Sequence, residues 1–572
     1  MAQNVSSRVK QALSCLILAL VCSSFAGEKH FIGHSWDLLK VTTDDLVRNR
    51  SKLEKLPLSG ISISLSAKSA DGKRTVYTRD ILSDPAWNRK NYRGEIENIK
   101  KISSGKLKHN FLLTNLAPKK RLKWTDDAAW ENAAHNAAVL AWVARNSGVK
   151  GIMIDPEDYY KTKQFKHFPD DPPYGKTAAL ARKRGAQIMK AMAGEYPDIV
   201  LLSFYFLGGS FKTGDPNLQT DVKLKVPFID GMLDELPPGA QMVDATEMGY
   251  ACSAANHNFY QLAWNILWKA GKLLSPENRI KLQQYQVGFG LYLDMYTDPE
   301  SREWSHPATD GSRLTTLFND FSEAMTCADQ YCWIYGEKFS WIKWDCADRL
   351  LKSPPRHMKI KPETWEEKLP GFSKALTFIA KGEKAYQEAY DNLVKKHRLV
   401  NRIRNPKCLP GKKVKTTAPA AGDWDTGSLP PGWYFWSANR KEGSFGLDTK
   451  VGMDDSFSVT VTGKNNAAFI HNVKVKPGQI YACEAFKKGG KDSRLSIRWR
   501  KGGKWVVAMK YDVAIPFSGK PDKRGWQKAF GFVKVPPEAD TLVFLIGTNL
   551  KPNETAWYDN PCVSLITPED LP

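Results

Sequence analysis

From residue 31 to about residue 344, short apolar runs alternate with longer stretches in which apolar residues recur at helical spacing. The apolar runs predict strands at residues 31–35, 60–66, 110–116, 151–155, 200–206, 241–246, 287–294 and 331–336. The stretches between them predict helices, among them residues 43–56, 127–146, 177–194, 260–271 and 314–328. Eight such alternations over about 310 residues predict an α/β fold of the (β/α)8 TIM-type barrel class.

An open, doubly wound sheet is the structural alternative to the barrel. Such a sheet usually carries a glycine-rich phosphate turn after its first strand. Here the first strand runs directly into Trp36, Asp37 and Leu38. The barrel is therefore the favoured fold.

The pattern changes after the barrel. Residues 374–396 have helical spacing, and we expect them to pack on the outside of the barrel or to cap one of its ends. Residues 401–429 are rich in Lys, Pro, Gly, Ala and Thr without a period, which indicates a linker. From residue 430, short alternating runs punctuated by turn residues predict an all-β jelly-roll sandwich. The predicted division is a barrel with its trailing helix at 27–400, a linker at 401–429 and a sandwich at 430–572.

The first 26 residues have the layout of a secretory signal peptide. Arg8 and Lys10 precede an apolar run at residues 12–21, and Ser24 and Ala26 place small residues at the cleavage positions. The run is too short to span a membrane, and no later run of about 18 apolar residues follows. We therefore expect a secreted or periplasmic protein without a membrane anchor.

Composition and charge narrow the class of protein. The chain is 42% hydrophobic and 25% charged, which excludes a collagen, a coiled coil and a multi-pass membrane protein. Its net charge of +22 falls to +20 when the segment carrying Arg8 and Lys10 is removed. Over half of the excess lies beyond residue 400, as either a solvated basic face or a face that binds polyanions. We expect no nucleic-acid partner, because the chain is exported and has no reading motif.

The cysteines and histidines do not form a recognisable metal motif. Seven cysteines remain after the signal peptide, without a CxxC or a Cys/His pair at zinc spacing. We expect one or two structural disulfides, with Cys408 as a candidate partner, and neither a metal nor a cofactor. His34, His109 and His257 could line a pocket or be hydrogen-bonded residues at the barrel ends. The chain also lacks a Gly-x-Ser-x-Gly elbow, a P-loop and an HExxH motif.

A barrel places its active site where the carboxyl ends of its strands meet, and the fourth predicted strand ends in acids. Asp155 and Glu157 flank Pro156, which ends the strand and lets both carboxylates project from the rim. Like charges held close together raise one another's pKa, which suits a general acid. We predict Glu157 as that acid, with Asp155 holding or polarising it. In the alternative reading, Asp155 caps the next segment and Glu157 is solvated.

Three more strand ends carry acids. Glu247 follows the sixth strand and is predicted as nucleophile or base, and Glu337 after the eighth strand is held in reserve. Any one of these acids could be an ordinary ion pair, but acids interleaved with Trp and Tyr at four strand ends favour glycoside hydrolysis. The predicted substrate-binding residues at these rims are Trp36, Tyr159, Tyr205, Tyr250, Asp294, Tyr296 and Tyr335.

These features resemble a secreted barrel glycoside hydrolase with a C-terminal carbohydrate-binding module. The barrel resemblance rests on the acidic motifs at residues 151–157 and 244–247, and the module resemblance on the aromatic motifs at residues 433–436 and 556–560. The resemblance implies catalysis by paired carboxylates. The sequence departs from the largest barrel clan, which has Asn-Glu after the fourth strand and Glu after the seventh. Asp155-Pro156-Glu157 and Asp294 stand there instead, so the second carboxylate stays open.

The sequence therefore predicts an exported hydrolase of a polysaccharide, with an anionic (sulfated or uronic) polysaccharide as the expected substrate. Lys338 and Lys343 are the candidates for offsetting substrate charge in the cleft. The alternative is a non-catalytic glycan-binding or surface-adhesion protein with a degenerate barrel. In the sandwich, the expected glycan-binding candidates are Arg498, Trp499, Arg500, Lys501, Lys504 and Trp505, with Trp499 on the face opposite Arg498 and Arg500.

Overall fold

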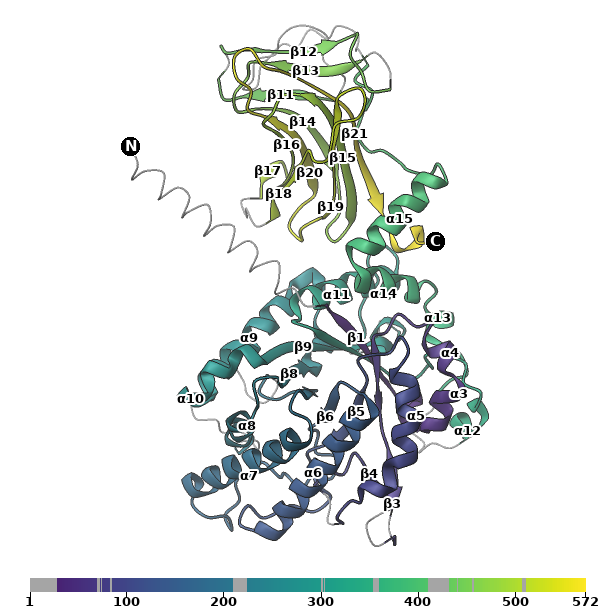
Figure 1. Ribbon diagram of the computed structural model, residues 1–572, viewed down its shortest axis with the longest axis vertical. Helices are drawn as coiled ribbons and strands as arrows, with labels where there is room; N and C mark the ends of the chain where they lie inside the picture. The colour runs from purple at the N-terminus through teal and green to yellow at the C-terminus, as the bar shows by residue number, and fades with distance from the viewer. Residues whose placement is uncertain are drawn as a thin grey trace. The chain divides into compact units, whose positions relative to one another are not determined.

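The computed structural model describes residues 28–572 except 69–71, 74, 83–84, 209–223, 300–301, 303, 353–359, 410–431, 440, 455–456 and 507–510. The chain divides into two compact units, Met1–Ala380 and Lys381–Pro572 (Figure 1). The predicted signal peptide lies outside the described residues. Among the described helices, none combines the length and the apolar character needed to cross a membrane.

The first unit contains the predicted barrel. Its parallel strands are β1 (His30–Ser35), β2 (Gly60–Ile63), β5 (Phe111–Asn115), β6 (Gly151–Asp155), β7 (Val200–Ser203), β8 (Gln241–Thr246), β9 (Tyr285–Tyr292) and β10 (Tyr331–Gly336). They close in the order β1-β10-β9-β8-β7-β6-β5-β2. The strands pack so closely that a Cβ on Gly151 would lie 1.9 Å from the Val200 carbonyl oxygen. The (β/α)8 prediction is confirmed.

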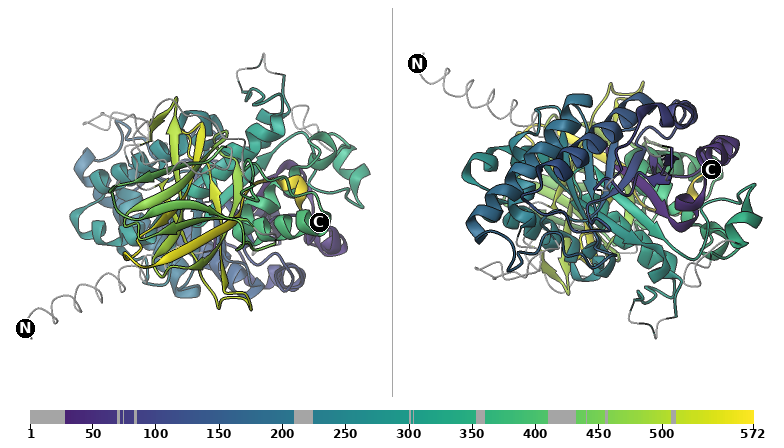
Figure 2. Two further views of the ribbon diagram at one scale, coloured as in Figure 1. Left: turned by 90° about the horizontal axis from the view of Figure 1, so that it is seen from above. Right: turned by 90° about the horizontal axis from the view of Figure 1, so that it is seen from below.

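Helices surround the barrel strands (Figure 2). They are α2 (Trp36–Lys40), α3 (Thr43–Arg48), α4 (Arg50–Leu53), α5 (Arg93–Ser103), α6 (Asp127–Ser147), α7 (Tyr174–Glu195), α8 (Lys225–Asp234), α9 (Asn258–Leu273), α10 (Pro276–Arg279), α11 (Arg313–Cys327), α12 (Ala347–Lys352), α13 (Trp365–Lys368) and α14 (Phe372–Lys381). Local signals set their ends: α6 begins where Asp126 accepts the Ala129 N–H and ends at Gly148, which is left-handed with φ 71°. A short hairpin, β3 (Ser66–Lys68) and β4 (Thr75–Tyr77), follows β2.

The amino-terminal end of the barrel is plugged by aromatic and histidine side chains. His30 and His109 stack with ring centroids 3.5 Å apart, and His109 hydrogen-bonds to the Tyr331 hydroxyl at 3.0 Å. Burial, together with the charge of Lys150, lowers the pKa of His30 to about 4. Of the two readings of His109, the hydrogen-bonded residue at the barrel end is therefore correct.

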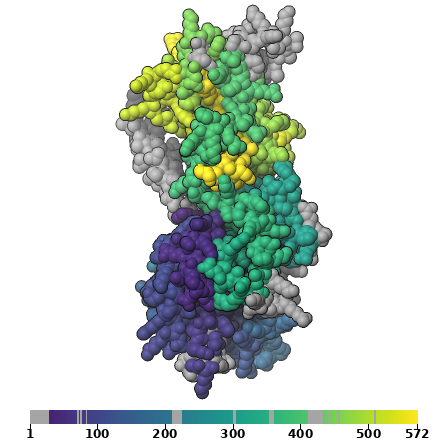
Figure 3. Space-filling model, turned by 90° about the vertical axis from the view of Figure 1, so that its right-hand side faces the viewer, coloured from purple at the N-terminus to yellow at the C-terminus, as the bar shows by residue number. Residues whose placement is uncertain are grey.

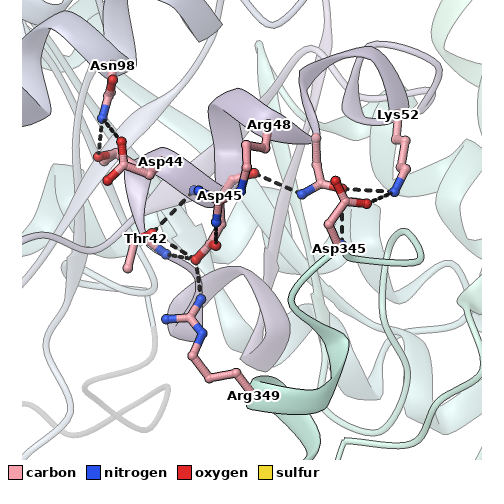
Figure 4. A network of polar contacts seen from close by, with 10 residues as sticks. Thr42, Asp44, Asp45, Arg48, Lys52, Asn98, Asp345 and Arg349 are labelled. Carbon is pink, nitrogen blue, oxygen red and sulfur yellow. Dashed lines mark hydrogen bonds and ion pairs between the residues drawn. The ribbon is translucent and has the colours of Figure 1, made fainter.

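A polar network joins the helices after β1 to the segment after β10. Thr42 and Asp45 form a capping box at the start of α3, and Asp45 also accepts hydrogen bonds from Arg48 and Arg349 (Figure 4). Lys52 bonds to the Lys343 carbonyl at 2.9 Å and to Asp345. Figure 3 shows these purple and green regions side by side on one face of the barrel. The network thus links the segment that follows β10 to the helices that follow β1.

The second unit is an antiparallel sandwich. One sheet has the order β11-β14-β20-β16-β17 with β18 beside β16, and the other has the order β12-β13-β21-β15-β19. Their bounds are β11 (Tyr434–Ser437), β12 (Ser444–Asp448), β13 (Ser458–Thr462), β14 (Ala467–Lys474), β15 (Ile480–Gly489), β16 (Ser493–Lys501), β17 (Lys504–Trp505), β18 (Val513–Pro516), β19 (Trp526–Lys534), β20 (Thr541–Thr548) and β21 (Thr555–Ile566). The predicted jelly-roll class is confirmed.

Side-chain alternation along β16 is as predicted. Trp499 is fully buried in the sandwich core. Arg498 and Arg500 lie on the opposite face, with their guanidinium carbons 4.5 and 4.2 Å from the ring centroid of Trp505. Trp505 itself is exposed. The basic and aromatic groups proposed for binding therefore divide between the core and the surface.

The predicted trailing helix is two helices that belong to different units. Gly382, with φ 53°, separates α14 from α15 (Glu383–Lys395). Tyr390 of α15 packs 4.9 Å from the Phe530 ring and donates a hydrogen bond of 2.9 Å to Glu484, both in the sandwich. Residues 401–409 of the expected linker also belong to the sandwich, because Ile403 and Cys408 are buried in its core. The rest of the expected linker, residues 410–429, lies outside the described residues.

The expected disulfides are not formed. The seven cysteines of the described residues are all thiols: Cys252, Cys327, Cys332, Cys346, Cys408, Cys483 and Cys562. Five of them are buried, and four of these five serve as small apolar side chains in the cores: Cys252 and Cys332 in the barrel, Cys408 and Cys483 in the sandwich. The disulfide expectation is wrong because the number of cysteines in a chain expected to be exported does not report whether any two sulfurs face each other.

Candidate active site

A cleft of about 1590 Å³ opens at the carboxyl ends of the barrel strands. Its lining includes the predicted residues Trp36, Asp155, Glu157, Tyr159, Tyr205, Glu247, Tyr250, Tyr335 and Glu337. Barrel closure brings these residues together from loops far apart in the sequence. The structure shows that these residues line one cleft, and the chemical role of each of them stays a prediction.

Asp155, the last residue of β6, is a buried anion that organises the turn after it. One carboxylate oxygen accepts the Arg79 guanidinium at 2.9 Å, and the other accepts the Glu157 N–H at 3.0 Å. Burial, only partly offset by the charge of Arg79, raises the pKa of Asp155 to about 6. Asp155 therefore both caps the turn and holds the backbone of Glu157.

Glu157 is held at the cleft wall from two further directions. The Asn115 amide, at the end of β5, donates to the Glu157 carbonyl at 3.1 Å. The Tyr159 hydroxyl donates to the Glu157 carboxylate. These contacts fix a carboxylate that is only partly buried and remains open to the cleft.

Glu247 begins the 3-10 turn Glu247–Ala251 that follows β8. Its N–H donates to the Phe204 carbonyl at 2.9 Å, and the Tyr250 hydroxyl donates to its carboxyl group at 3.3 Å. Burial, followed by the negative charges of Glu157 and Asp155, raises the pKa of Glu247 to about 8. Glu247 is therefore mainly protonated at neutral pH, beside two other carboxyl groups.

Glu337 follows β10 and accepts the Tyr335 hydroxyl at 2.9 Å. Its N–H donates to Asp294 at 2.9 Å. Asp294 has no exposed surface and lies 3.7 Å from the Lys338 ammonium, and burial raises the pKa of Asp294 to about 6. Asp294 thus supports the β10 terminus from beneath and does not line the cleft, contrary to its predicted role in binding substrate.

Tyr296, which was also predicted to bind substrate at the rim, does not line the described cleft. Its ring is 3% exposed, stacks on His306, and its hydroxyl donates to Asp320 at 2.9 Å. After β9 the chain turns into the 3-10 helix Leu293–Tyr296, so strand alternation no longer decides which side chains face the rim. Tyr292, the last residue of β9, lines the cleft instead.

Aromatic rings form the floor and walls of the cleft. Phe204 and Trp333 stack at 4.1 Å on the floor, and the Trp333 indole N–H donates to the Ala245 carbonyl at 2.7 Å. Tyr292 and Tyr335 stack at 5.3 Å on one wall. Flat faces of this kind suit the apolar faces of sugar rings.

His34 belongs to this floor, while His257 lies elsewhere. The His34 ring hydrogen-bonds to Ser62 at 2.7 Å and stacks on Tyr335 at 5.4 Å. Burial, helped by the charge of Arg79, lowers the pKa of His34 to about 3, so the ring is neutral. His257 contacts Glu323 at 3.2 Å and is not among the described residues that line the cleft.

Asp244, part of the acidic motif at residues 244–247, has a structural role. It is fully buried and accepts the N–H groups of Phe206, Leu207 and Gly208 at 2.7 to 3.0 Å. The Tyr285 hydroxyl adds a fourth bond at 2.7 Å. Asp244 therefore shapes the β7 loop that carries Tyr205.

Several residues that line the cleft were not predicted from the sequence, because they lie outside the acidic strand ends. Tyr77 ends β4 of the hairpin inserted after β2, and Arg79 lies in the turn that follows it; the alternating stretch at residues 75–78 was the available signal. The other missed residues include Asn115, Lys119, Tyr160, Tyr292, Asp298, Arg302, Trp304 and Trp333. Among the described residues, no group of three or more His, Cys, Asp or Glu side chains is placed to hold a metal ion.

Comparisons with known proteins add little to this geometry. No protein-family model and no curated protein sequence matches the chain. Among solved structures, TmCBM61 in complex with β-1,4-galactotriose matches at 12% identity over 29% of this chain and 99% of its own, with a TM-score of 0.19. The CBM22-1 xylan-binding domain from Paenibacillus barcinonensis Xyn10C matches at 14% identity over 24% of this chain and 86% of its own, with a TM-score of 0.19. The enzymatically active domain of bacteriophage CBA120 tailspike protein 4 matches at 17% identity and a TM-score of 0.20, over 24% of this chain and only 20% of its own length.

Proposed function

We propose that the barrel is a glycoside hydrolase in which Glu247 is the general acid and Glu157 is the opposing nucleophile or base. The observation that carries the proposal is that Glu247 and Glu157 line one cleft walled by aromatic rings, where burial and negative neighbours raise the pKa of Glu247 to about 8. This assignment reverses the roles expected from the sequence. The reversal follows from burial, which raises the pKa of Glu247 and cannot be predicted from a motif at a strand end.

The chemistry uses these two residues on opposite sides of a glycosidic bond. Glu247 donates its proton to the oxygen that leaves, and Glu157 attacks the anomeric carbon or removes a proton from an attacking water. Asp155 keeps its charge through Arg79 and holds the Glu157 backbone in place. Glu247 regains a proton from water in the second half of a retaining cycle, or from solvent after an inverting one.

We further propose that the protein is exported and that its sandwich binds glycan. The support for binding is the basic character of the chain beyond residue 400 and the exposed rings of Trp436 and Trp505, the latter covered by Arg498 and Arg500. In a gel containing polysaccharide, the fragment 381–572 should migrate more slowly than in a plain gel, and Trp505→Ala should weaken the effect. Unchanged migration with every polysaccharide would rule out the binding role.

The decisive experiment measures new reducing ends after incubation with sulfated, uronic and neutral polysaccharides. Glu157→Gln and Glu247→Gln should each lower turnover at least a hundredfold, because each removes an essential proton-transfer or nucleophilic group. Glu131→Gln, an exposed residue of α6, is the matched control and should leave turnover unchanged. Retention of a third of the turnover in both variants would contradict the assignment. Binding without any reducing ends would favour the non-catalytic alternative.

A further inference from the structure

The cleft alone is poorly suited to an acidic sugar. Its described lining carries six carboxyl groups and four cationic side chains. Each of those cations already faces an acid: Arg79 faces Asp155 at 2.9 Å, Lys119 faces Asp80 at 3.0 Å, and Arg302 and Lys338 both face Asp298. Lys343, the other expected candidate, pairs with Glu367 at 2.5 Å and does not line the described part of the cleft.

A second, smaller pocket next to the cleft has the opposite charge balance. It has a volume of about 340 Å³, and Tyr205 lines both this pocket and the cleft. Three lysines and one acid line it: Lys161, Lys163, Lys225 and Asp158.

The acid of this pocket is already engaged in holding its loop. Both oxygens of Asp158 accept N–H groups of the following turn, from Thr162 at 3.0 Å and from Lys163. These bonds stabilise a turn in which Lys161 and Lys163 adopt left-handed φ values of 55° and 49°. The turn thereby places Lys161 and Lys163 at the smaller pocket, while Glu157, at the start of the same segment after β6, lines the cleft.

Lys225 is the unusual member of the set because it is 2% exposed. Among the described residues its ammonium donates one hydrogen bond, to the Tyr205 carbonyl at 3.1 Å, and it lies 4.3 Å from the Tyr205 ring centroid. An ammonium has three N–H donors. Burial, partly offset by the charge of Asp244, lowers the pKa of Lys225 to about 7. An anion in the pocket would favour the charged form and use the remaining donors.

We propose that this pocket is a subsite for an anionic substituent, a sulfate ester or a carboxylate, on the glycan that occupies the cleft. The inference rests on the proposed function, since it identifies the class of substrate for the same site. A pyranose whose ring contacts Tyr205 from the cleft would place its substituent among the lysines. Lys161, Lys163 and Lys225 are then the residues that determine specificity for charged over uncharged glycan.

The test compares charged and uncharged forms of one polysaccharide: a sulfated glycan with its desulfated form, and a uronate polymer with its methyl ester. Wild-type protein should show a KM at least about tenfold lower on the charged member of one pair, and the pair that responds identifies sulfate or carboxylate. Lys225→Met and Lys161→Met should raise KM on that charged member about tenfold and leave KM on the uncharged member unchanged. Lys161 is exposed, so this variant keeps the test valid if Lys225→Met does not fold.

The control is Lys176→Met, which removes the same charge from an exposed position of α7 that lines neither pocket. It should not change KM on either member. Equal KM values on the charged and uncharged members for wild-type protein, or equal losses on both for the pocket variants, would overturn the subsite.

A failure of the proposed function would be recognised separately. If no polysaccharide releases reducing ends, retardation of the full chain in gels of dextran sulfate and dextran decides on the subsite. Weaker retardation of Lys161→Met than of Lys176→Met in dextran sulfate supports the anion site. Equal retardation overturns it, because only net charge would then matter.

Discussion

At the scale of single residues, environment separates carboxyl groups that look alike in the sequence. Asp155 is buried but paired with Arg79, whereas Glu247 is partly buried and is raised in pKa by the negative charges of Glu157 and Asp155 as well as by burial. The first stays largely ionised at neutral pH, and the second keeps its proton. The difference gives the cleft a proton donor and a charged group within one site.

The raised pKa of Glu247 predicts the pH dependence of activity. Since the acid form is needed, kcat/KM should fall as the pH rises through about 8, and the Glu247→Gln variant should lack this alkaline limb in its residual activity. A rate profile from pH 5 to 10 checks this. An alkaline limb unchanged in Glu247→Gln would assign it to another group.

The same shift predicts an effect on stability. The folded state binds more protons at Glu247 than the unfolded chain does between about pH 4.5 and 8, so its contribution to stability decreases as the pH rises through this window. Glu247→Gln removes the penalty and should raise the free energy of unfolding at pH 8.5 by about 1 kcal/mol or more. Denaturant unfolding at pH 5 and pH 8.5 measures it, and a gain confined to pH 5 would contradict the sign.

Tyr296 tests the distinction between the cleft and the structure beneath it. Tyr296→Phe removes a buried hydrogen bond to Asp320 and should lower the free energy of unfolding by about 1–3 kcal/mol. Because the ring does not line the described cleft, KM should stay the same. A raised KM with unchanged stability would restore Tyr296 to substrate binding.

At the scale of elements, the polar network at the start of α3 joins the segment after β1, the first barrel strand in the sequence, to the segment after β10, the last one. Asp45 is 2% exposed, caps α3 and accepts Arg349 from α12. Burial opposes ionisation of Asp45, but the hydrogen bonds from Thr42 and Arg349 outweigh it and hold its pKa below the usual value. One side chain thus serves both a helix cap and a tertiary contact.

Asp45→Ala should lower the free energy of unfolding of the barrel by about 1–3 kcal/mol, from the lost cap and the lost ion pair. The stabilising effect of Asp45 is present above the unfolded pKa, near 3.9, and is lost as the pH falls through its lower folded pKa. Asp44→Ala is the control, since Asp44 is exposed and contacts Asn98 at 2.8 Å. Equal losses in both variants would mean that the network does not stabilise the barrel.

At the scale of the whole molecule, the chain is two compact units whose boundary lies at residue 380 and not at 400 or 430. Helix α15 and residues 401–409 supply Tyr390, Ile403 and Cys408 to the sandwich. Helix α15 and residues 401–409 therefore belong to the sandwich, although the local sequence pattern assigns them to the barrel and the linker.

A fragment of residues 381–572 should fold by itself, and a fragment of residues 430–572 should be less stable by several kcal/mol. The shorter fragment loses two buried side chains and the α15 contacts, and each buried apolar side chain removed costs about 2–5 kcal/mol. Thermal unfolding of both fragments measures the difference. Equal midpoints would place the boundary at 430.

Local pattern was sufficient for the architecture, because strand and helix periodicity are properties of neighbouring residues. The eight barrel strands, the sandwich and the alternation of Trp499 against Arg498 and Arg500 all follow from it. Position at strand ends was also sufficient to find Asp155, Glu157, Glu247 and Glu337, since barrel closure brings all strand ends to one rim.

Only the tertiary structure decided which groups these side chains contact and how deeply they are buried. Asp294 and Tyr296 point beneath the cleft because the chain leaves β9 through a 3-10 turn. Arg79 reaches Asp155 from the turn after the β3–β4 hairpin, far away in sequence. The raised pKa of Glu247 and the burial of Lys225 depend on how many atoms exclude water around each group. Such burial is set by segments that fold together from across the chain, so no local pattern of polar and apolar residues contains it.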